Sequence, residues 1–171
     1  MPVITAARLE DAEGVFEVQR ATWLATYCKP EMGLTEEVLR RRLDGEDGCR
    51  QAERIEGWRS AIADPARAVL VVRAGQAVVG FTAPGSWDAR RRVGALYVLP
   101  PWHGVGLGGL LLEAALDWHG GAGPVFANVA SFNERAIRFY RRHGFRATGA
   151  AVIDHGATAG EVPIPLIEMS L

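Results

Sequence analysis

A glycine-rich segment, PWHGVGLGGLL, lies between two apolar runs of different periodicity and constrains the fold more than any other part of the chain. The run before it, at 93–99, has strand character and ends at Pro100 and Pro101, because proline cannot donate to a β-ladder. The run after it begins at Leu107 and keeps helical spacing until Gly120. The sequence therefore predicts a strand, a loop with alternating glycines and a helix.

The alternating glycines indicate an anion site. Gly104, Gly106 and Gly108 at a strand-to-helix junction expose consecutive backbone N–H groups at the positive end of a helix dipole, which suits a phosphate or pyrophosphate. The alternative is a loop whose glycines only permit close packing. The G-x-G-x-x-G spacing also admits a dinucleotide fold, but four residues separate the strand from Gly104 and the next strand carries no acid. Leucines stand where a nucleotide-hydrolysing P-loop needs Lys and Ser/Thr, which excludes that class.

The remaining pattern predicts one α/β domain over residues 1–171. Helices are expected from about Glu10 to Tyr27, over 35–64 with a break near 44–48, and over 134–143 with Asn133 as N-cap. Strands are expected near 3–5, as a hairpin around RAGQ within 68–85, at 124–130, and at 149–154 and 164–171 around a loop at 155–163. Residues 87–92 read as a polar connection.

Composition excludes several classes. The net charge of -1 gives no general attraction to polyanions, so no nucleic-acid partner is expected. Cys28 and Cys49 form neither a disulfide framework nor a metal-ligand spacing, so no metal is expected. Charged residues at Arg8 and Glu10 argue against a signal peptide, and prolines and glycines interrupt the uncharged stretch 93–112. A cytoplasmic protein without membrane contact is the expectation.

Two motifs resemble a known family. LYVLPPWHGVGLGGLLLEAALDW resembles the acetyl-CoA-binding segment of the GNAT superfamily of N-acetyltransferases, whose loop reads Q/R-x-x-G-x-G/A. His103, Gly106 and Gly108 occupy those positions, with His103 replacing the usual Gln or Arg. A second family segment is matched by NERAIRFYRRHGF through Asn133, Tyr140, Gly144 and Phe145.

The resemblance implies a GNAT-type α/β (α+β) fold with a central mixed, mostly antiparallel, splayed sheet of about 6–7 strands and about 4–5 flanking helices. Its fourth and fifth strands open a V-shaped cleft for acetyl-CoA, the co-substrate. The residues implied in cofactor binding are Leu96, Tyr97, Val98, His103, Gly104, Val105, Gly106, Leu107, Gly108, Gly109, Asn133 and Tyr140.

Acetyl transfer from a thioester to an amine needs a neutral amine, a polarised carbonyl and a proton for the thiolate. The resemblance assigns the proton donor to Tyr140, whose alternative role is an ordinary core tyrosine. Many relatives place a Glu near the start of the fourth strand, where this chain has arginines at 90–92. No general base is assigned; the candidates are Asp88, Asp154, His155 and Glu168.

Trp23 and Tyr27 end an aromatic stripe on the first helix, which is either core or, by the resemblance, part of the acceptor pocket. The expected function is transfer of acetyl from acetyl-CoA to a primary amine of a small molecule, peptide or protein. Another acyl-CoA donor and a CoA-binding regulatory or interaction module without turnover are the alternatives. The expected assembly is a monomer or a homodimer.

Overall fold

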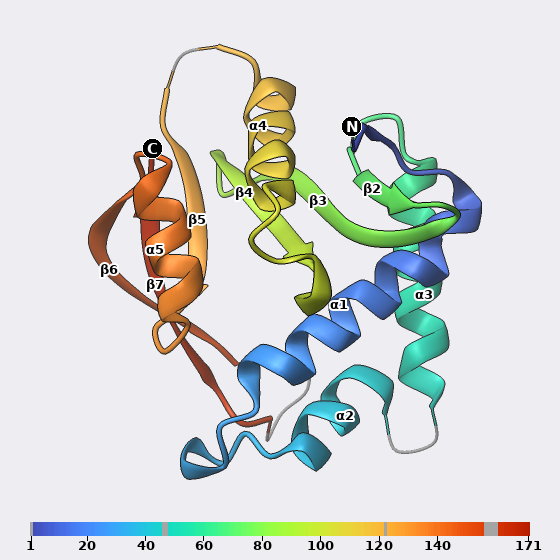
Figure 1. The fold of residues 1–171 in the computed structure, drawn as a ribbon. Coiled ribbons are helices and arrows are strands. Elements are labelled where there is room, and N and C mark those ends of the chain that lie inside the picture. Colours follow the sequence, from blue (N-terminus) through green and yellow to red (C-terminus); the bar gives the residue numbers. More distant parts are fainter. Residues whose placement is uncertain (1, 46–47, 122, 156–160) are drawn as a thin grey trace.

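Seven strands, within the part of the chain that the structure describes, form one mixed sheet with helices on both faces (Figure 1). The computed structural model describes residues 2–45, 48–121, 123–155 and 161–171. The strands are β1 (Ile4–Ala6), β2 (Leu70–Ala74), β3 (Ala77–Trp87), β4 (Arg90–Val98), β5 (Val125–Ala130), β6 (Arg146–Asp154) and β7 (Ile164–Ser170). The helices are α1 (Ala12–Tyr27), α2 (Glu36–Asp44), α3 (Cys49–Ala63), α4 (Leu107–His119) and α5 (Glu134–Arg142). The predicted α/β class is confirmed.

The sheet, ordered β1-β2-β3-β4-β5-β7-β6, is antiparallel except where β4 meets β5. That parallel contact is short: among the described residues, Arg91 pairs with Val125 and Arg92 with Phe126, and no further pair follows. Beyond these pairs β4 remains bonded to β3, and β5 to β7. The sheet is therefore joined at one end of the β4–β5 contact and open at the other.

A β-bulge at Gly94 bends β4 immediately after its last pair with β5. Ala83 of β3 faces both Gly94 and Ala95, so β4 contains one extra residue. Gly94 has a φ of +68°, and a Cβ atom there would overlap the carbonyl oxygen of Ala83. Because a bulge increases the bend and twist of its strand, Gly94 accounts for the divergence of β4 from β5.

The helices divide between the two faces of the sheet. Val18 of α1 and Ala61 of α3 pack with Phe81 on one face. Leu111 of α4 packs with Val79 on the other. These contacts bury the apolar stripes of the helices, which is the usual source of helix stability in a layered α/β fold.

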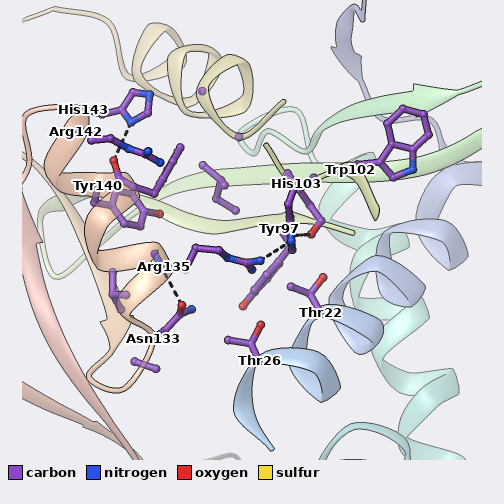
Figure 2. A pocket seen from close by; sticks show the side chains of 18 of the residues that line it. Thr22, Thr26, Tyr97, Trp102, His103, Asn133, Arg135, Tyr140, Arg142 and His143 are labelled. Carbon is purple, nitrogen blue, oxygen red and sulfur yellow. Dashed lines mark hydrogen bonds between the residues drawn. The ribbon is translucent and has the colours of Figure 1, made fainter. Parts of the chain in front are cut away.

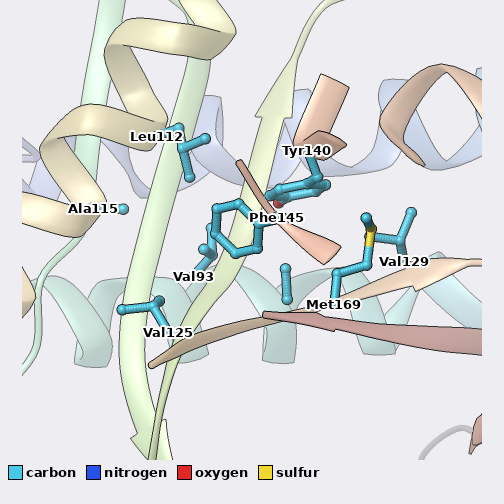
Figure 3. Packing of buried hydrophobic residues seen from close by; sticks show 9 residues of the cluster. Val93, Leu112, Ala115, Val125, Val129, Tyr140, Phe145 and Met169 are labelled. Atoms are coloured by element: carbon cyan, nitrogen blue, oxygen red, sulfur yellow. The ribbon is translucent and has the colours of Figure 1, made fainter. Parts of the chain in front are cut away.

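One apolar cluster bridges the two parts of the sheet on the face that carries α4 and α5 (Figure 3). Val93 of β4 and Leu112 of α4 meet Tyr140 of α5, Phe145 and Met169 of β7. At about 0.8 kcal/mol for each buried CH₂ group, this cluster holds together strands that share few hydrogen bonds. It lies where β4 and β5 are still close, so it stabilises the closed end of the sheet.

The prediction of a polar connection at 87–92 is wrong. Strands β3 and β4 continue through this segment except for a two-residue turn at Asp88 and Ala89, whose φ values are 52° and 58°. The arginines at 90–92 are therefore strand residues. A run of consecutive polar residues hid the strand, because it lacks the alternation of apolar and polar residues that indicates one.

The predicted helical segment at 35–64 consists of two helices, α2 and α3. Thr35 caps α2 as predicted, because its hydroxyl accepts a hydrogen bond from the backbone N–H of Val38 at 3.2 Å. Parts of the expected break at 44–48 and of the expected loop at 155–163 lie outside the described residues. Strand β6 begins three residues earlier than predicted, at Arg146 rather than Gly149.

The uncharged stretch at 93–112 is divided among β4, a short turn and α4. None of the described helices is long and apolar enough to cross a membrane.

The Gly94 bulge yields a stability prediction. Gly94→Ala should lower the free energy of unfolding by about 2 kcal/mol or more, because alanine would be strained at positive φ and its Cβ would overlap Ala83. Gly57→Ala in α3 is the control, since a Cβ there meets nothing within 4 Å and alanine favours a helix by up to about 1 kcal/mol. Urea denaturation of both variants gives the comparison. A Gly94→Ala protein as stable as the parent would contradict the assigned bulge.

Candidate active site between β4 and β5

A cavity of about 430 Å³ occupies the gap between β4 and β5 and extends to the N-terminus of α4, the inner face of α5 and the C-terminal half of α1 (Figure 2). Of the twelve residues predicted for cofactor binding, ten line it: Leu96, Tyr97, Val98, His103, Gly104, Gly106, Gly108, Gly109, Asn133 and Tyr140. Val105 and Leu107 do not. The side chain of Val105 is 63% exposed and that of Leu107 packs into the core, so only their backbone groups face the loop.

The glycine loop leaves the N-terminus of α4 without a cap. Gly106 is the N-cap residue, with a φ of +90°, and no side chain accepts from the first turn. Within the described chain, the backbone N–H groups from Gly104 to Gly109 donate no hydrogen bond. A Cβ at Gly104 or Gly106 would meet nothing within 4 Å, so the space above the loop is open. Unpaired donors at a positive helix end form a site for an anion.

His103 does not point freely into the anion site. Its Nε2 lies 2.7 Å from the carbonyl oxygen of Val98, and its Nδ1 contacts the Arg135 guanidinium (Figure 2). Since guanidinium groups only donate, Nδ1 is the acceptor and Nε2–H donates to Val98. Burial lowers the pKa of His103 below 6.5, and the neighbouring Arg135 lowers it further. His103 is thus a neutral residue that orients Arg135.

Helix α5 supplies most of the cavity's charge. Arg135, Arg142 and His143 line the cavity at positions i, i+7 and i+8, which share one face of a helix. Asn133 begins that helix, because its Oδ1 accepts from the N–H of Ala136 at 3.1 Å. Asn133 therefore has two roles, since it both lines the cavity and caps α5. No aspartate or glutamate is among the described residues that line the cavity.

Tyr140 lies at the middle of the cavity wall and is only 8% exposed. Its ring makes edge contacts with Phe139 and Phe145, with centroids 5.2 and 5.1 Å away. Burial raises the pKa of Tyr140 well above its usual value of 10, with the neighbouring Tyr97 as a smaller cause. The phenol therefore stays protonated at neutral pH, so its O–H is available to donate a hydrogen bond.

The two predicted acceptor residues differ in position. Tyr27 lines the cavity, whereas Trp23 lies behind the wall, so the assignment of Trp23 as a direct contact is not supported. Instead the Trp23 indole Nε1–H donates to the hydroxyl of Tyr97 at 3.0 Å and packs edge-on against Tyr27 at 4.8 Å. Trp23 thus fixes Tyr97, a residue of β4 whose pKa is raised by burial.

None of the four candidate bases lines the cavity. Asp154 is 2.8 Å from the buried Arg42, and Glu168 accepts hydrogen bonds from Arg90 and Arg92. Asp88 lies in the β3–β4 turn, and His155 follows β6. Among the described residues, no free carboxylate reaches the site.

Sequence reasoning missed about half of the described lining residues: Thr22, Thr26, Gly94, Trp102, Asn128, Val129, Ala130, Arg135, Ala136, Phe139, Arg142 and His143. Some carried a usable signal. Thr22 and Thr26 are four apart on α1, and Arg142 and His143 follow Arg135 by seven and eight residues, which places these basic residues on one face of α5. Asn128 interrupts an otherwise apolar strand. The rest depend on where β4 and β5 separate.

Many solved structures share the fold of this chain. PaiA N-acetyltransferase from Thermoplasma acidophilum, crystallised with coenzyme A, aligns with a TM-score of 0.70 and 20% identity over 99% of this chain and 98% of that chain. A GNAT phosphinothricin acetyltransferase from Sinorhizobium meliloti, in complex with acetyl-CoA, aligns with a TM-score of 0.67 and 17% identity over 99% and 87%. These matches establish the fold.

Residues 32–145 match the model of the acetyltransferase (GNAT) family, so the chain belongs to that family. An N-acetyltransferase of Mycobacterium tuberculosis without an assigned role is 37% identical over 101 residues, 56% of this chain and 64% of that protein. Streptothricin acetyltransferase of Streptomyces lavendulae is 32% identical over 122 residues, 69% of this chain and 59% of that enzyme. The chain thus spans about three fifths of these curated relatives.

The orientation of His103 is testable by NMR. Its imidazole should titrate with a pKa below 6.5 and carry its proton on Nε2, because burial and Arg135 both disfavour the cation. In Arg135→Ala the pKa should rise, since one cause of its depression is removed. A pKa of His103 above 6.5 in the parent protein would show that the imidazole is not held against Arg135.

Proposed function

We propose that this protein is an acetyl-CoA-dependent N-acetyltransferase that passes the acetyl group directly to a primary amine while both substrates are bound. One observation carries the proposal: the cavity connects an uncapped, cation-flanked helix N-terminus to an opening beside α1 that Thr22, Thr26 and Tyr27 line. Membership of the acetyltransferase family supports the same ligand. So do the solved relatives crystallised with coenzyme A or acetyl-CoA.

The residues present fit a coenzyme A pyrophosphate at the glycine loop. Free N–H groups from Gly104 to Gly109 provide donors, and Arg135 with Arg142 provides positive charge nearby. His103 contributes indirectly by holding Arg135. This arrangement replaces the Gln or Arg that relatives place in the loop with a cation from α5.

The unpaired edge of β4 fits the pantetheine arm. Leu96, Tyr97 and Val98 lie beyond the last pair with β5, so their backbone groups on that side have no strand partner. An amide-containing chain lying in the gap would complete the ladder in the way that an added strand does. The Val98 carbonyl already accepts from His103, which leaves it one further lone pair.

In the reaction, the amine nitrogen attacks the thioester carbon, the C–S bond breaks, and one amine proton ends on the thiol. Tyr140 acts at the sulfur. Its raised pKa makes full proton transfer to a thiolate of pKa about 8.5 unfavourable, so its role is to donate a hydrogen bond to the departing sulfur. The amine loses its proton to water, because no carboxylate lines the described cavity.

The second candidate is a CoA-binding module without turnover, and the absence of a lining carboxylate favours it. Thiol release in the presence of acetyl-CoA and a panel of amines separates the two. Thiol release that is faster with at least one amine than without any amine supports the enzyme. Tight binding of coenzyme A without release with any amine supports the module.

The anion site predicts a specific loss of binding. Gly106→Glu should weaken coenzyme A binding at least about tenfold in calorimetry, because it places a negative side chain in the open space above the loop. Gly75→Glu is the matched control: it adds the same charge at positive φ in the β2–β3 turn, away from the cavity. Unchanged affinity in a folded Gly106→Glu protein, or saturable binding of NAD by the parent, would refute the site.

The role of Tyr140 predicts a change in turnover. Tyr140→Phe should lower kcat by about tenfold with acetyl-CoA affinity unchanged, since the ring and its packing remain while the hydrogen bond to sulfur is lost. Tyr97→Phe removes another phenolic hydroxyl of the wall and serves as the comparison. Unchanged kcat in Tyr140→Phe between about pH 6 and 9 would remove it from the mechanism.

A further inference from the structure

An arginine lies next to the acceptor end of the cavity, at the point where β4 and β5 separate; it does not itself line the cavity but contacts a residue that does. Arg92 is in the last residue pair of the two strands, and its Nη1 lies 3.2 Å from Oδ1 of Asn128, a residue that lines the cavity. Asn128 alternates with Ala127 and Val129, which pack into the cluster beneath α4 and α5, so it faces the opposite side of the sheet. The guanidinium of Arg92 therefore reaches the side from which α1 borders the cavity.

Arg92 is not neutralised there. Glu168 on β7 accepts two hydrogen bonds from Arg90, at 3.0 and 2.9 Å, and a longer one from Arg92, at 3.4 Å. Two arginines thus share one carboxylate, which leaves a charge of +1 at this cluster. Within the described chain, Arg92 donates to two oxygens, whereas a guanidinium has five N–H groups. The side chain of Arg92 also keeps 17% of its surface exposed.

No described acidic residue faces the cavity to balance this charge. After burial, the negative charge of Asp154 contributes to the raised pKa values of Tyr27 and Tyr97. This carboxylate is already paired with Arg42 at 2.8 Å. An acceptor whose groups are all cationic, such as a diamine, would meet positively charged side chains and no described carboxylate with which to pair. An acceptor that carries a carboxylate near its amine would find the donors of Arg92.

We propose that the acceptor is an amino acid or a closely similar small molecule, in which a carboxylate near the reacting amine is bound by Arg92. Guanidinium and carboxylate form charge-assisted, often bidentate hydrogen bonds, which add orientation as well as affinity. Binding the carboxylate at Arg92 directs the amine along the gap toward Tyr97 and Tyr140, where the thioester would lie. The assignment rests on the proposed acetyltransferase function.

The test compares amino acids with the amines formed by their decarboxylation, such as tyrosine with tyramine and lysine with cadaverine. The preference is the ratio of kcat/KM for the two members of a pair, followed by thiol release. The parent protein should prefer the carboxylated member of at least one pair by about tenfold or more, the size of one charge-assisted hydrogen bond. Equal rates for every pair, or a preference for the decarboxylated amines, would overturn the proposal.

Variants of neighbouring arginines identify the residue responsible. Arg92→Gln should remove most of the preference while the KM for acetyl-CoA stays unchanged, and Arg92→Lys should retain part of it. Arg91→Gln is the control, because its guanidinium instead reaches the carbonyls of Gly120 and Gly121 beyond α4. A preference that survives in Arg92→Gln would show that another group recognises the carboxylate.

Calorimetry separates this proposal from the proposed function. The same pairs are titrated into protein saturated with coenzyme A, so recognition is measured without turnover. Tighter binding of the amino acid, lost in Arg92→Gln, with no thiol release would sustain the carboxylate site and refute the transferase. Thiol release with amines but no difference within any pair would sustain the transferase and refute the carboxylate site.

Discussion

The short contact between β4 and β5 is the constraint on which the rest of the structure depends. Two residue pairs join these strands before the bulge at Gly94 turns β4 away. Backbone groups at an interior position of a sheet are normally paired, because leaving them unpaired and dry is costly. Here the two facing edges are instead open to a cavity. The fold thus leaves backbone N–H and C=O groups of two strands available for hydrogen bonds to a bound molecule.

The elements around the gap differ sharply in charge and in side-chain packing. Helix α5 and the loop before α4 present positive charge and free N–H groups, which a highly charged, strongly hydrated group needs. The opposite opening is formed by threonines and tyrosines, with Tyr97 held in place by the indole of Trp23. Aromatic packing between Trp23, Tyr27 and Phe132 makes this wall stiff. A site for a charged group and a pocket walled by packed aromatic residues therefore lie at opposite ends of one cavity.

Local signals in the sequence were sufficient for the elements and for the glycine loop. The double proline ends β4, Gly106 allows the turn into α4, and Asn133 caps α5, each through conformational preferences of a few adjacent residues. The arginines at 90–92 were misread because three consecutive polar residues lack the alternation that indicates a strand. The position of Trp23 behind Tyr97, the pairing of Arg135 with His103 and the approach of Arg92 to Asn128 join residues distant in sequence. Such contacts follow from the divergence of the strands, and no local pattern specifies which distant residues meet there.

The split sheet also has a mechanical consequence. Strands β1 to β4 with α4 form one wall of the gap, and β5 to β7 with α5 form the other; the cluster around Phe145 joins them at the closed end. A molecule bound between the α4 N-terminus, the β4 edge and α5 would bridge both walls and act as a removable crosslink. Binding to the native state alone adds about 2.7 kcal/mol of stability at a ligand concentration of 100 times Kd. In a cell where such a ligand is abundant, the resistance of this protein to unfolding and proteolysis would follow the supply of its own substrate.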